Sequence, residues 1–265
     1  MELLQENYFW PGVKEAVEEF LKNCRFCSTT KGKSTREPLK AIIVKEPRER
    51  LQFDISKLPK DSHGYIGFIS AIDCHTKYFR IRLIKDEKAD EVADFLNKIS
   101  APDEKKPWKK PWKKYQSDNG KNLNAKVVEE IIEKVHGKHI NSLPYNPSTN
   151  GQIERPHATI KDKIFALCEE RKVPWSEVIK EAVFYYNISP HSSTKYIPWV
   201  LEKGREAPKE YSKRKAPTAI IPEERLKEII IETTTNLEHA ADNRARAFNK
   251  KVKYTKFEVG GNSLI

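Results

Sequence analysis

The chain has 265 residues, 38% of them hydrophobic, so it is long enough to bury a core and to form one or two domains. Its 49 Lys and Arg against 38 Asp and Glu give a net charge of +11, which favours a polyanionic partner: nucleic acid first, an anionic membrane surface second. No apolar run approaches the roughly 18–20 residues that span a bilayer, and the N-terminal MELLQEN lacks the apolar region of a secretory signal. Four cysteines are too few for a disulfide scaffold and indicate a reducing compartment.

The N-terminal residues 1–30 are predicted to form a small helical module, followed by a linker over 31–46. The helix is marked by apolar residues at helical spacing, namely Val13, Val17, Phe20 and Leu21. Cys24 and Cys27 follow it as a Cys-x-x-Cys pair, which is half of a tetrahedral zinc site. Two plain buried cysteines, or a redox pair, are the alternatives.

Residues 47–205 predict an α/β domain. The expected strands are short and share turn residues at their ends: 51–55, 65–72, 78–83, 115–118 and 139–143. The expected helices have apolar residues at helical spacing: 89–99, 127–135, 152–172 and 175–188. The order β-β-β-α-β-α-β-α predicts a five-stranded mixed sheet with flanking helices, its first three strands forming an antiparallel meander.

The C-terminal part begins with a second predicted linker over residues 206–222, which contains three prolines and several basic residues. A charged helix is expected over 223–250. Residues 223–265 are therefore predicted to comprise this helix and the start of a further C-terminal domain.

A basic repeat, KKPWKKPWKK, occupies residues 105–114. Its prolines exclude a helix interior, so we expect an extended cationic loop. Its lysines are expected to follow DNA phosphates, and Trp108 and Trp112 to stack on bases or sugars; a solvated loop is the alternative. The DNA-binding candidates in the repeat are Lys109, Lys110, Lys113 and Lys114.

Three acids predict a metal site. Asp54 lies within the apolar strand LQFDI, where an ionised side chain is costly unless it is paired or binds a cation. Asp118 follows the fourth strand in SDNG, and Glu154, after 35 intervening residues, opens a helix in NGQIER. Acids on adjacent strands and on a helix across the same edge can share divalent ions, and oxygen ligands suit Mg²⁺ or Mn²⁺. With 38 acids in the chain, context rather than spacing carries this prediction.

These motifs closely resemble the catalytic core of retroviral and gypsy-type retrotransposon integrases, to which Ginger-type transposases are related. LQFDI, SDNG and PYNPSTNGQIER carry the resemblance. Flanking segments match the same family in order: YFWPG with CRFC its zinc module, AIDCHTKY its core, SSTKYIPWVLEKGRE the segment after the core, and FEVGG the entry to its C-terminal barrel. The likeness covers roughly residues 5–260.

The resemblance implies an RNase H-like core and a polynucleotidyl transferase that uses two Mg²⁺ or Mn²⁺ ions to trim 3′ ends and join them to target DNA. Asp54, Asp118 and Glu154 would be its catalytic, metal-binding acids. His157, one turn further, is interpreted as a packing or surface residue, and a metal ligand is the alternative. The residues that match DNA-contacting positions, or that shape the turn beside the acids, are Asn119, Tyr145, Asn150 and Lys161. A homo-oligomer acting on element ends and target DNA is implied, in the nucleus or in a cytoplasmic particle before entry.

The chain departs from the family at three places. No histidine precedes Cys24, so Cys24 and Cys27 form a half-site, and zinc is expected only in a longer form. The basic repeat replaces a shorter Gly-x-Pro turn, and Val-Gly-Gly replaces Val-Gly-Asp near the end. We therefore expect an integrase truncated at both ends. Two alternatives stay open: a decayed or domesticated, non-catalytic DNA-binding relic, and an RNase H-like nuclease, against which the flanking motifs argue.

Overall fold

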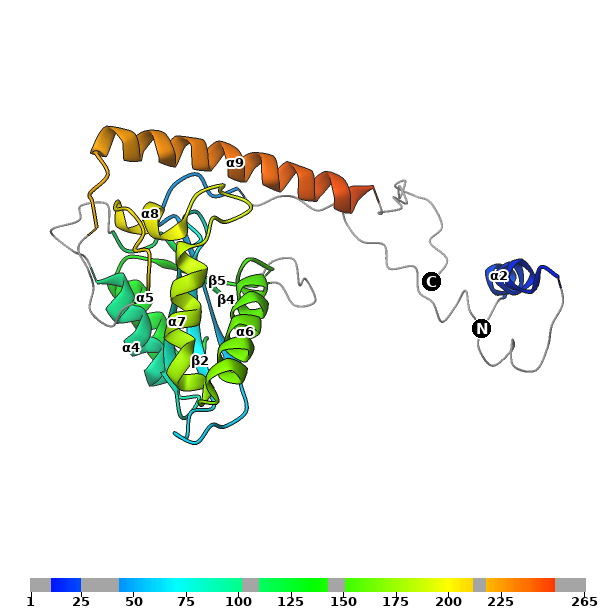
Figure 1. The fold of residues 1–265 in the computed structure, drawn as a ribbon, viewed down its shortest axis with the longest axis horizontal. Coiled ribbons are helices and arrows are strands. Elements are labelled where there is room, and N and C mark those ends of the chain that lie inside the picture. The colour runs from blue at the N-terminus through cyan, green and yellow to red at the C-terminus, as the bar shows by residue number, and fades with distance from the viewer. Residues whose placement is uncertain (1–10, 25–42, 102–109, 143–150, 212–217, 251–265) are drawn as a thin grey trace. The chain divides into compact units, whose positions relative to one another are not determined.

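The computed structural model describes residues 11–24, 43–101, 110–142, 151–211 and 218–250. The chain divides into two compact units, one of residues 41–243 and one that combines residues 1–40 with 244–265. The larger unit, hereafter the core, contains the sheet and the candidate site (Figure 1).

The core is built on a five-stranded mixed sheet, as the order of elements predicts. Its strands are β1 (Arg50–Lys57), β2 (Gly67–Asp73), β3 (Phe79–Ile84), β4 (Lys114–Ser117) and β5 (Lys138–Asn141). They lie in the order β3-β2-β1-β4-β5. The pairs β1–β2 and β2–β3 are antiparallel, which confirms the meander, and β1–β4 and β4–β5 are parallel.

Helices cover both faces of this sheet (Figure 1). One face packs against α4 (Ala89–Ser100) and α5 (Lys126–Lys134), and the other against α6 (Gly151–Arg171) and α7 (Trp175–Ile188). Because side chains alternate along a strand, Leu51 and Phe53 of β1 point into the α4–α5 cluster. The intervening residues of β1, including Asp54, therefore face α6 and α7.

Two further helices complete the described part of the core, α8 (Pro198–Lys203) and α9 (Glu223–Asn249). The buried side of α9 carries Leu226, Ile229, Thr233, Leu237 and Ala241. Polar contacts hold it to loops of the core: Thr234 Oγ1 donates to the carbonyl of Lys45 at 2.9 Å, and Asn236 Nδ2 to that of Thr194 at 3.0 Å. Within the described ranges, no helix is both long and apolar enough to cross a bilayer.

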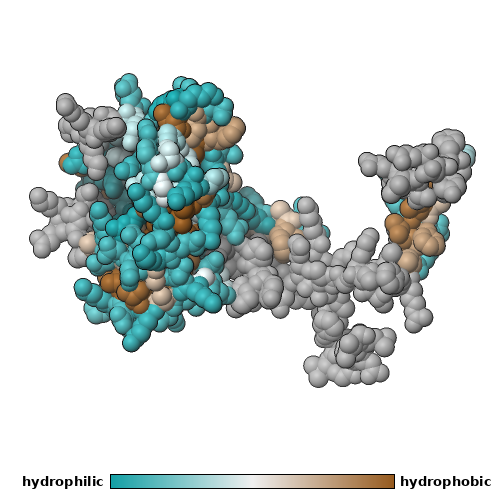
Figure 2. Space-filling view, turned by 90° about the horizontal axis from the view of Figure 1, so that it is seen from below, coloured by the Kyte–Doolittle hydropathy of each residue, from teal (hydrophilic) through white to brown (hydrophobic). Residues whose placement is uncertain are grey.

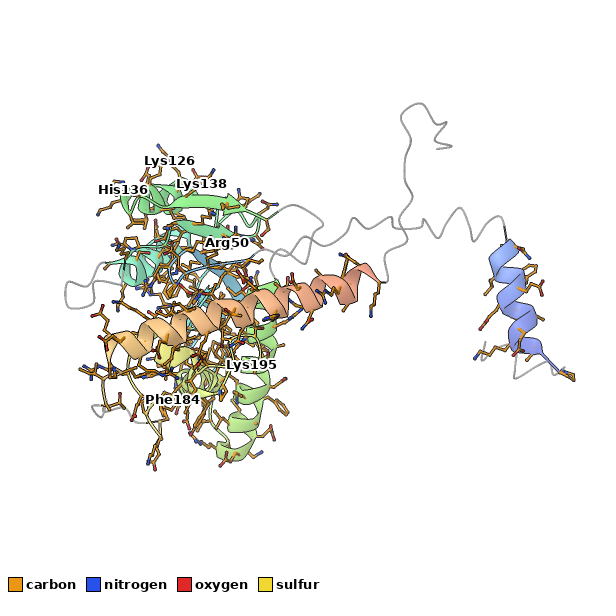
Figure 3. All side chains as sticks on the ribbon, turned by 90° about the horizontal axis from the view of Figure 1, so that it is seen from above. Arg50, Lys126, His136, Lys138, Phe184 and Lys195 are labelled. Atoms are coloured by element: carbon orange, nitrogen blue, oxygen red, sulfur yellow. The ribbon has the colours of Figure 1, made fainter. Side chains whose placement is uncertain are left out.

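One face of the core is largely polar. The face drawn in Figure 2 is mainly hydrophilic, with small, separate hydrophobic areas. In Figure 3, Lys126, His136 and Lys138 lie together on one side of the core, and Phe184 and Lys195 on the other.

The second unit contains one described helix, α2 (Val13–Asn23), which carries the apolar residues that predict it. Phe20 is 71% exposed on this helix. Cys24 follows its last turn and is half-buried, whereas Cys27 lies outside the described residues.

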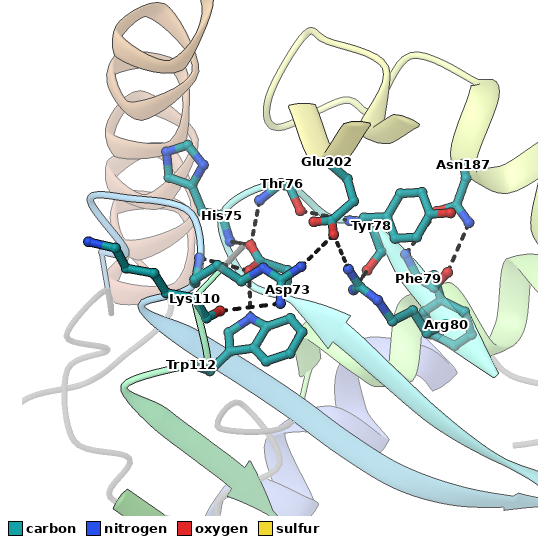
Figure 4. Close-up of polar contacts among 11 residues, drawn as sticks. Asp73, His75, Thr76, Tyr78, Phe79, Arg80, Lys110, Trp112, Asn187 and Glu202 are labelled. Carbon is teal, nitrogen blue, oxygen red and sulfur yellow. Dashed lines mark hydrogen bonds and ion pairs between the residues drawn. The ribbon is translucent and has the colours of Figure 1, made fainter. Parts of the chain in front are cut away.

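One prediction for the basic repeat is wrong: Trp112 does not form part of a surface for base stacking. It is 1% exposed, and its Nε1 donates to Asp73 Oδ2 at 2.6 Å (Figure 4). The guanidinium of Arg48 lies 3.8 Å from the centre of its ring. Trp112 precedes β4 directly, so the indole enters the core with that strand and satisfies a buried carboxylate.

The lysines at the end of the repeat are partly neutralised. Lys113 forms an ion pair with Glu46, and Lys114 Nζ lies 3.9 Å from Glu49 Oε1. Lys110 is exposed, and its backbone carbonyl accepts a hydrogen bond from Arg48. Lys109 and Trp108 fall outside the described residues. DNA binding by these lysines stays a prediction.

Candidate active site

The register between β1 and β4 sets the two aspartates side by side. Gln52 lies opposite Gln116 in this parallel pair, and Gln52 Nε2 donates to Gln116 Oε1 at 3.2 Å. Asp54 and Asp118 each follow two residues later, so both face α6, on strands that are about 4.8 Å apart. The sequence predicts that adjacent strands present both acids at one edge of the sheet. This register is compatible with that prediction, which stays a prediction.

Helix α6 brings the third acid to the same face. Ile153 and Ile160 are buried in the α6–α7 cluster, which leaves Glu154, between them, exposed in the first turn. Burial, together with the negative charges of Asp118 and Glu154, raises the pKa of Asp54 from 3.8 to about 6. Asp54 therefore lies close enough to both other carboxylates to be repelled by them. The positive charge of Lys161, also exposed on α6, partly offsets that repulsion.

His157 connects α6 to strands β1 and β2. Its Nε2 lies 2.6 Å from Ser70 Oγ, and its Nδ1 lies 3.8 Å from Asp54 Oδ2. Burial, followed by the charge of Lys161, lowers the pKa of His157 to about 4. The imidazole is neutral at pH 7, so its approach to Asp54 is not an ion pair. His157 is 8% exposed and its ring meets those of Phe68 and Phe79 edge to face, so of packing and surface the structure favours packing.

A tight turn orients Asp118. Asp118 Oδ1 accepts a hydrogen bond from the backbone N–H of Gly120 at 2.8 Å. A Cβ at position 120 would lie 2.9 Å from that oxygen, so a side chain there would displace the carboxylate of Asp118 from this turn. Asn119 Nδ2 donates to the carbonyl of Ser142 at 3.2 Å, which ties the ends of β4 and β5 together. Asn119 therefore shapes the turn, and its contact with DNA stays a prediction.

The donor set fits a hard divalent cation, because carboxylate oxygens are the ligands that Mg²⁺ and Mn²⁺ prefer. Across residues 11–24, 43–101, 110–142, 151–211 and 218–250, however, no three His, Cys, Asp or Glu side chains are arranged to hold one ion together. The raised pKa of Asp54 marks a carboxylate whose repulsion from Asp118 and Glu154 a cation would relieve. A metal here is therefore a proposal, developed below.

Several site residues are absent from the sequence-based prediction. Ser70, opposite Asp54 in the register, bonds to His157, and Lys77 bonds to Gln152 beside Glu154. A polar Ser70 inside the fully buried strand β2 is a signal that sequence reading could have used. Two predicted DNA-binding residues, Tyr145 and Asn150, lie outside the described residues.

Comparisons with known proteins point to one family. The family model "Integrase zinc binding domain" matches residues 1–33. A Pro-Pol polyprotein of feline foamy virus is 26% identical over 207 residues, covering 76% of this chain and 17% of that protein. The Transposon Tf2-3 polyprotein of Schizosaccharomyces pombe is 23% identical over 201 residues, covering 74% of this chain and 15% of that protein. The chain thus spans about a sixth of the length of the curated relatives it matches.

One solved structure shares the fold, and a second matches more weakly. A simian T-cell lymphotropic virus intasome, determined in complex with PP2A regulatory subunit B56 gamma, matches with a TM-score of 0.55 and 18% identity, covering 82% of this chain and 75% of that chain. The HTLV-2 integrase catalytic core domain in complex with magnesium matches with a TM-score of 0.47 and 20% identity, covering 60% of this chain and 97% of that chain.

The mixed sheet flanked by two helix layers is the fold that this chain shares with the matched intasome chain. Its first 33 residues are similar to an integrase zinc binding domain, and about three quarters of the chain is similar to parts of the Pro-Pol and Tf2 polyproteins.

Proposed function

We propose that this chain is a divalent-metal-dependent polynucleotidyl transferase that trims the 3′ ends of element DNA and joins them to target DNA. The observation that carries the proposal is Asp54, whose pKa of about 6 reflects burial and the charges of Asp118 and Glu154. These acids would hold two Mg²⁺ or Mn²⁺ ions. Bound in pairs, such ions activate the attacking oxygen and stabilise the leaving oxygen in phosphoryl transfer.

The surrounding residues have separate tasks in this proposal. Asp54 must be ionised to bind a cation, so metal binding should strengthen as the pH rises through about 6. Exposed Lys161, on the same helix as Glu154, would contact a DNA phosphate. Neutral His157 would hold α6 over the strands without adding charge. In a longer form of the chain, Cys24 and Cys27 would supply two of the four ligands of a zinc ion.

The partners follow from charge and family. The net charge of +11 suits DNA, and we propose element ends and target DNA as ligands and a homo-oligomer as the working form. The nucleus, where target DNA resides, is the proposed site of action.

The experiment is a disintegration assay on branched DNA with Mn²⁺, because this substrate already holds the reactants together. We expect strand rejoining by the wild-type chain and loss of at least about a hundredfold in Glu154→Gln. Glu170→Gln, which alters an exposed acid at the far end of α6, is the matched control and should retain activity. Full activity in Glu154→Gln would overturn the acid assignment. A folded, inactive wild type that binds DNA would favour the non-catalytic relic.

A further inference from the structure

The turn between β2 and β3 carries an unusual lysine. Lys77 is 6% exposed, although lysine is among the residues least often buried. Its backbone has φ +60°, in the left-handed region that costs free energy for a residue with a Cβ. Such a conformation persists only where the surroundings impose it, and it concentrates at functional sites.

The surroundings do impose this turn. Asp73, fully buried at the end of β2, accepts backbone hydrogen bonds from His75 at 2.9 Å and Thr76 at 2.8 Å through Oδ1 (Figure 4). Its Oδ2 accepts from the backbone N–H of Arg48 at 2.9 Å and from Trp112 Nε1 at 2.6 Å. Because four donors bond to one carboxylate, the backbone of this turn is fixed, and so is the position from which the side chain of Lys77 extends.

The ammonium of Lys77 reaches from this base to the start of α6. Lys77 Nζ donates to the carbonyl of Cys74 at 2.6 Å and to Gln152 Oε1 at 2.5 Å. Gln152 is in the first turn of α6, two residues before Glu154. We propose that Lys77 is a positioning residue, which fixes the first turn of α6 and thereby the place of the Glu154 carboxylate beside Asp54. Its catalytic consequence rests on the function proposed above.

Two attachments then flank Glu154 on α6. Gln152 is held by Lys77 on one side, and His157 is held by Ser70 on the other. The first turn needs such support because its backbone N–H groups have no partners within the helix. Buried Ile153 holds the apolar side of this turn. Without the contact from Lys77, the polar side of the turn would lose its link to the β2–β3 turn, and the first turn would open more often.

Hydrogen exchange tests the positioning directly. In Lys77→Met, which keeps the apolar stem, exchange of the second-turn amides of α6, which donate to the carbonyls of the first turn, should accelerate by roughly tenfold or more. Lys195→Met is the matched control, because Lys195 also has a left-handed backbone (φ +63°) but is exposed (Figure 3). It should leave α6 unchanged. Unchanged exchange in Lys77→Met would overturn the inference.

Two further variants keep the test decisive. Lys77→Gly removes the ammonium while relieving the backbone, so it covers the case in which Lys77→Met does not fold. Gln152→Leu removes the partner and should have the same effect as Lys77→Met. The double variant should then be no worse than either single one, whereas additive effects would show that Lys77 does not act through Gln152.

Turnover separates this inference from the proposed function. In the disintegration assay, Lys77→Met should lower kcat by about ten- to a hundredfold and leave the Kd for DNA within about twofold. Faster exchange with unchanged kcat would overturn the positioning role. If the wild-type chain shows no turnover, the proposed function fails, and the exchange measurement alone decides whether Lys77 holds α6.

Discussion

Asp54 affects both the proposed metal binding and the stability of the fold. Its folded pKa of about 6 exceeds its ordinary 3.8, so folding favours the protonated acid. The contribution of protonated Asp54 to the free energy of unfolding is therefore fully present below about pH 4 and is lost as the pH rises through 6. At neutral pH without metal, the ionised carboxylate destabilises the fold.

We accordingly expect Asp54→Asn to raise the free energy of unfolding in metal-free buffer at pH 7.5. The gain should be at most about 3 kcal/mol, and less in practice because 26% of the side-chain surface remains in contact with water. Urea unfolding with a chelator measures it, and the gain should shrink as the pH is lowered toward 4. Asp94→Asn, at an acid whose side chain is 75% exposed, is the control. A destabilised Asp54→Asn at pH 7.5 would contradict the account.

Divalent metal should stabilise the wild-type chain relative to Asp54→Asn. A cation that binds only the folded chain stabilises it in proportion to the logarithm of its concentration above Kd. Mn²⁺ should therefore raise the Tm of the wild-type chain and leave that of Asp54→Asn nearly unchanged. Equal shifts in both proteins, measured by calorimetry at pH 7.5, would place the metal elsewhere.

The two buried histidines make the opposite contribution. Burial lowers the pKa values of His75 and His157 from 6.5 to about 4. The contribution of the two neutral imidazoles to the free energy of unfolding is present above pH 6.5. It is lost as the pH falls toward 4, because the unfolded chain binds the protons more strongly. His157→Gln removes one such group, so unfolding should become less sensitive to pH between 6.5 and 4. A curve parallel to that of the wild-type chain would show that His157 titrates normally.

At the scale of elements, Trp112 connects β4 to the turn after β2. Trp112→Phe would remove a donor from the buried carboxylate of Asp73 and leave a small cavity, so we expect a loss of about 2–4 kcal/mol in urea unfolding. Trp175→Phe is the control, because the indole of Trp175 donates to the exposed carbonyl of Pro59, and should cost less than about 1 kcal/mol. DNA affinity should not change in Trp112→Phe, since the indole is not at the surface.

Most elements could be predicted because their apolar residues repeat with a clear period. Strand β1 alternates Leu51 and Phe53 toward one helix layer, and α6 repeats Ile153, Ile160 and Ile164 on its buried side. The sequence also predicts that the two aspartates meet at one edge of the sheet, because each accompanies a strand.

Other features depend on contacts between distant segments, which no local pattern reveals. The burial of Trp112 is hidden by the prolines and lysines around it, which suggest a solvated loop. The Lys77–Gln152 bond joins residues 75 positions apart. Lysine is so rarely buried that sequence alone favours the surface for Lys77.

At the scale of the whole molecule, the excess of 11 positive charges predicts DNA binding that weakens steeply with salt, by a slope of about −0.9 in log K against log salt for each phosphate neutralised. Replacing Lys110, Lys113 and Lys114 with Gln tests the basic repeat. If all three touch phosphates, the slope should become shallower by up to about 3. The ion pairs of Lys113 with Glu46 and of Lys114 with Glu49 compete with DNA, so a change nearer to 1, mainly from Lys110, is the expected result.

A triple change of Lys98, Lys126 and Lys134 to Gln removes the same charge from α4 and α5, on the sheet face opposite the acids, and should leave the slope almost unchanged. Fluorescence anisotropy from 50 to 300 mM salt measures both slopes. Equal slopes in the two triple variants would mean that the repeat contributes only net charge, and that the DNA track lies elsewhere on the core.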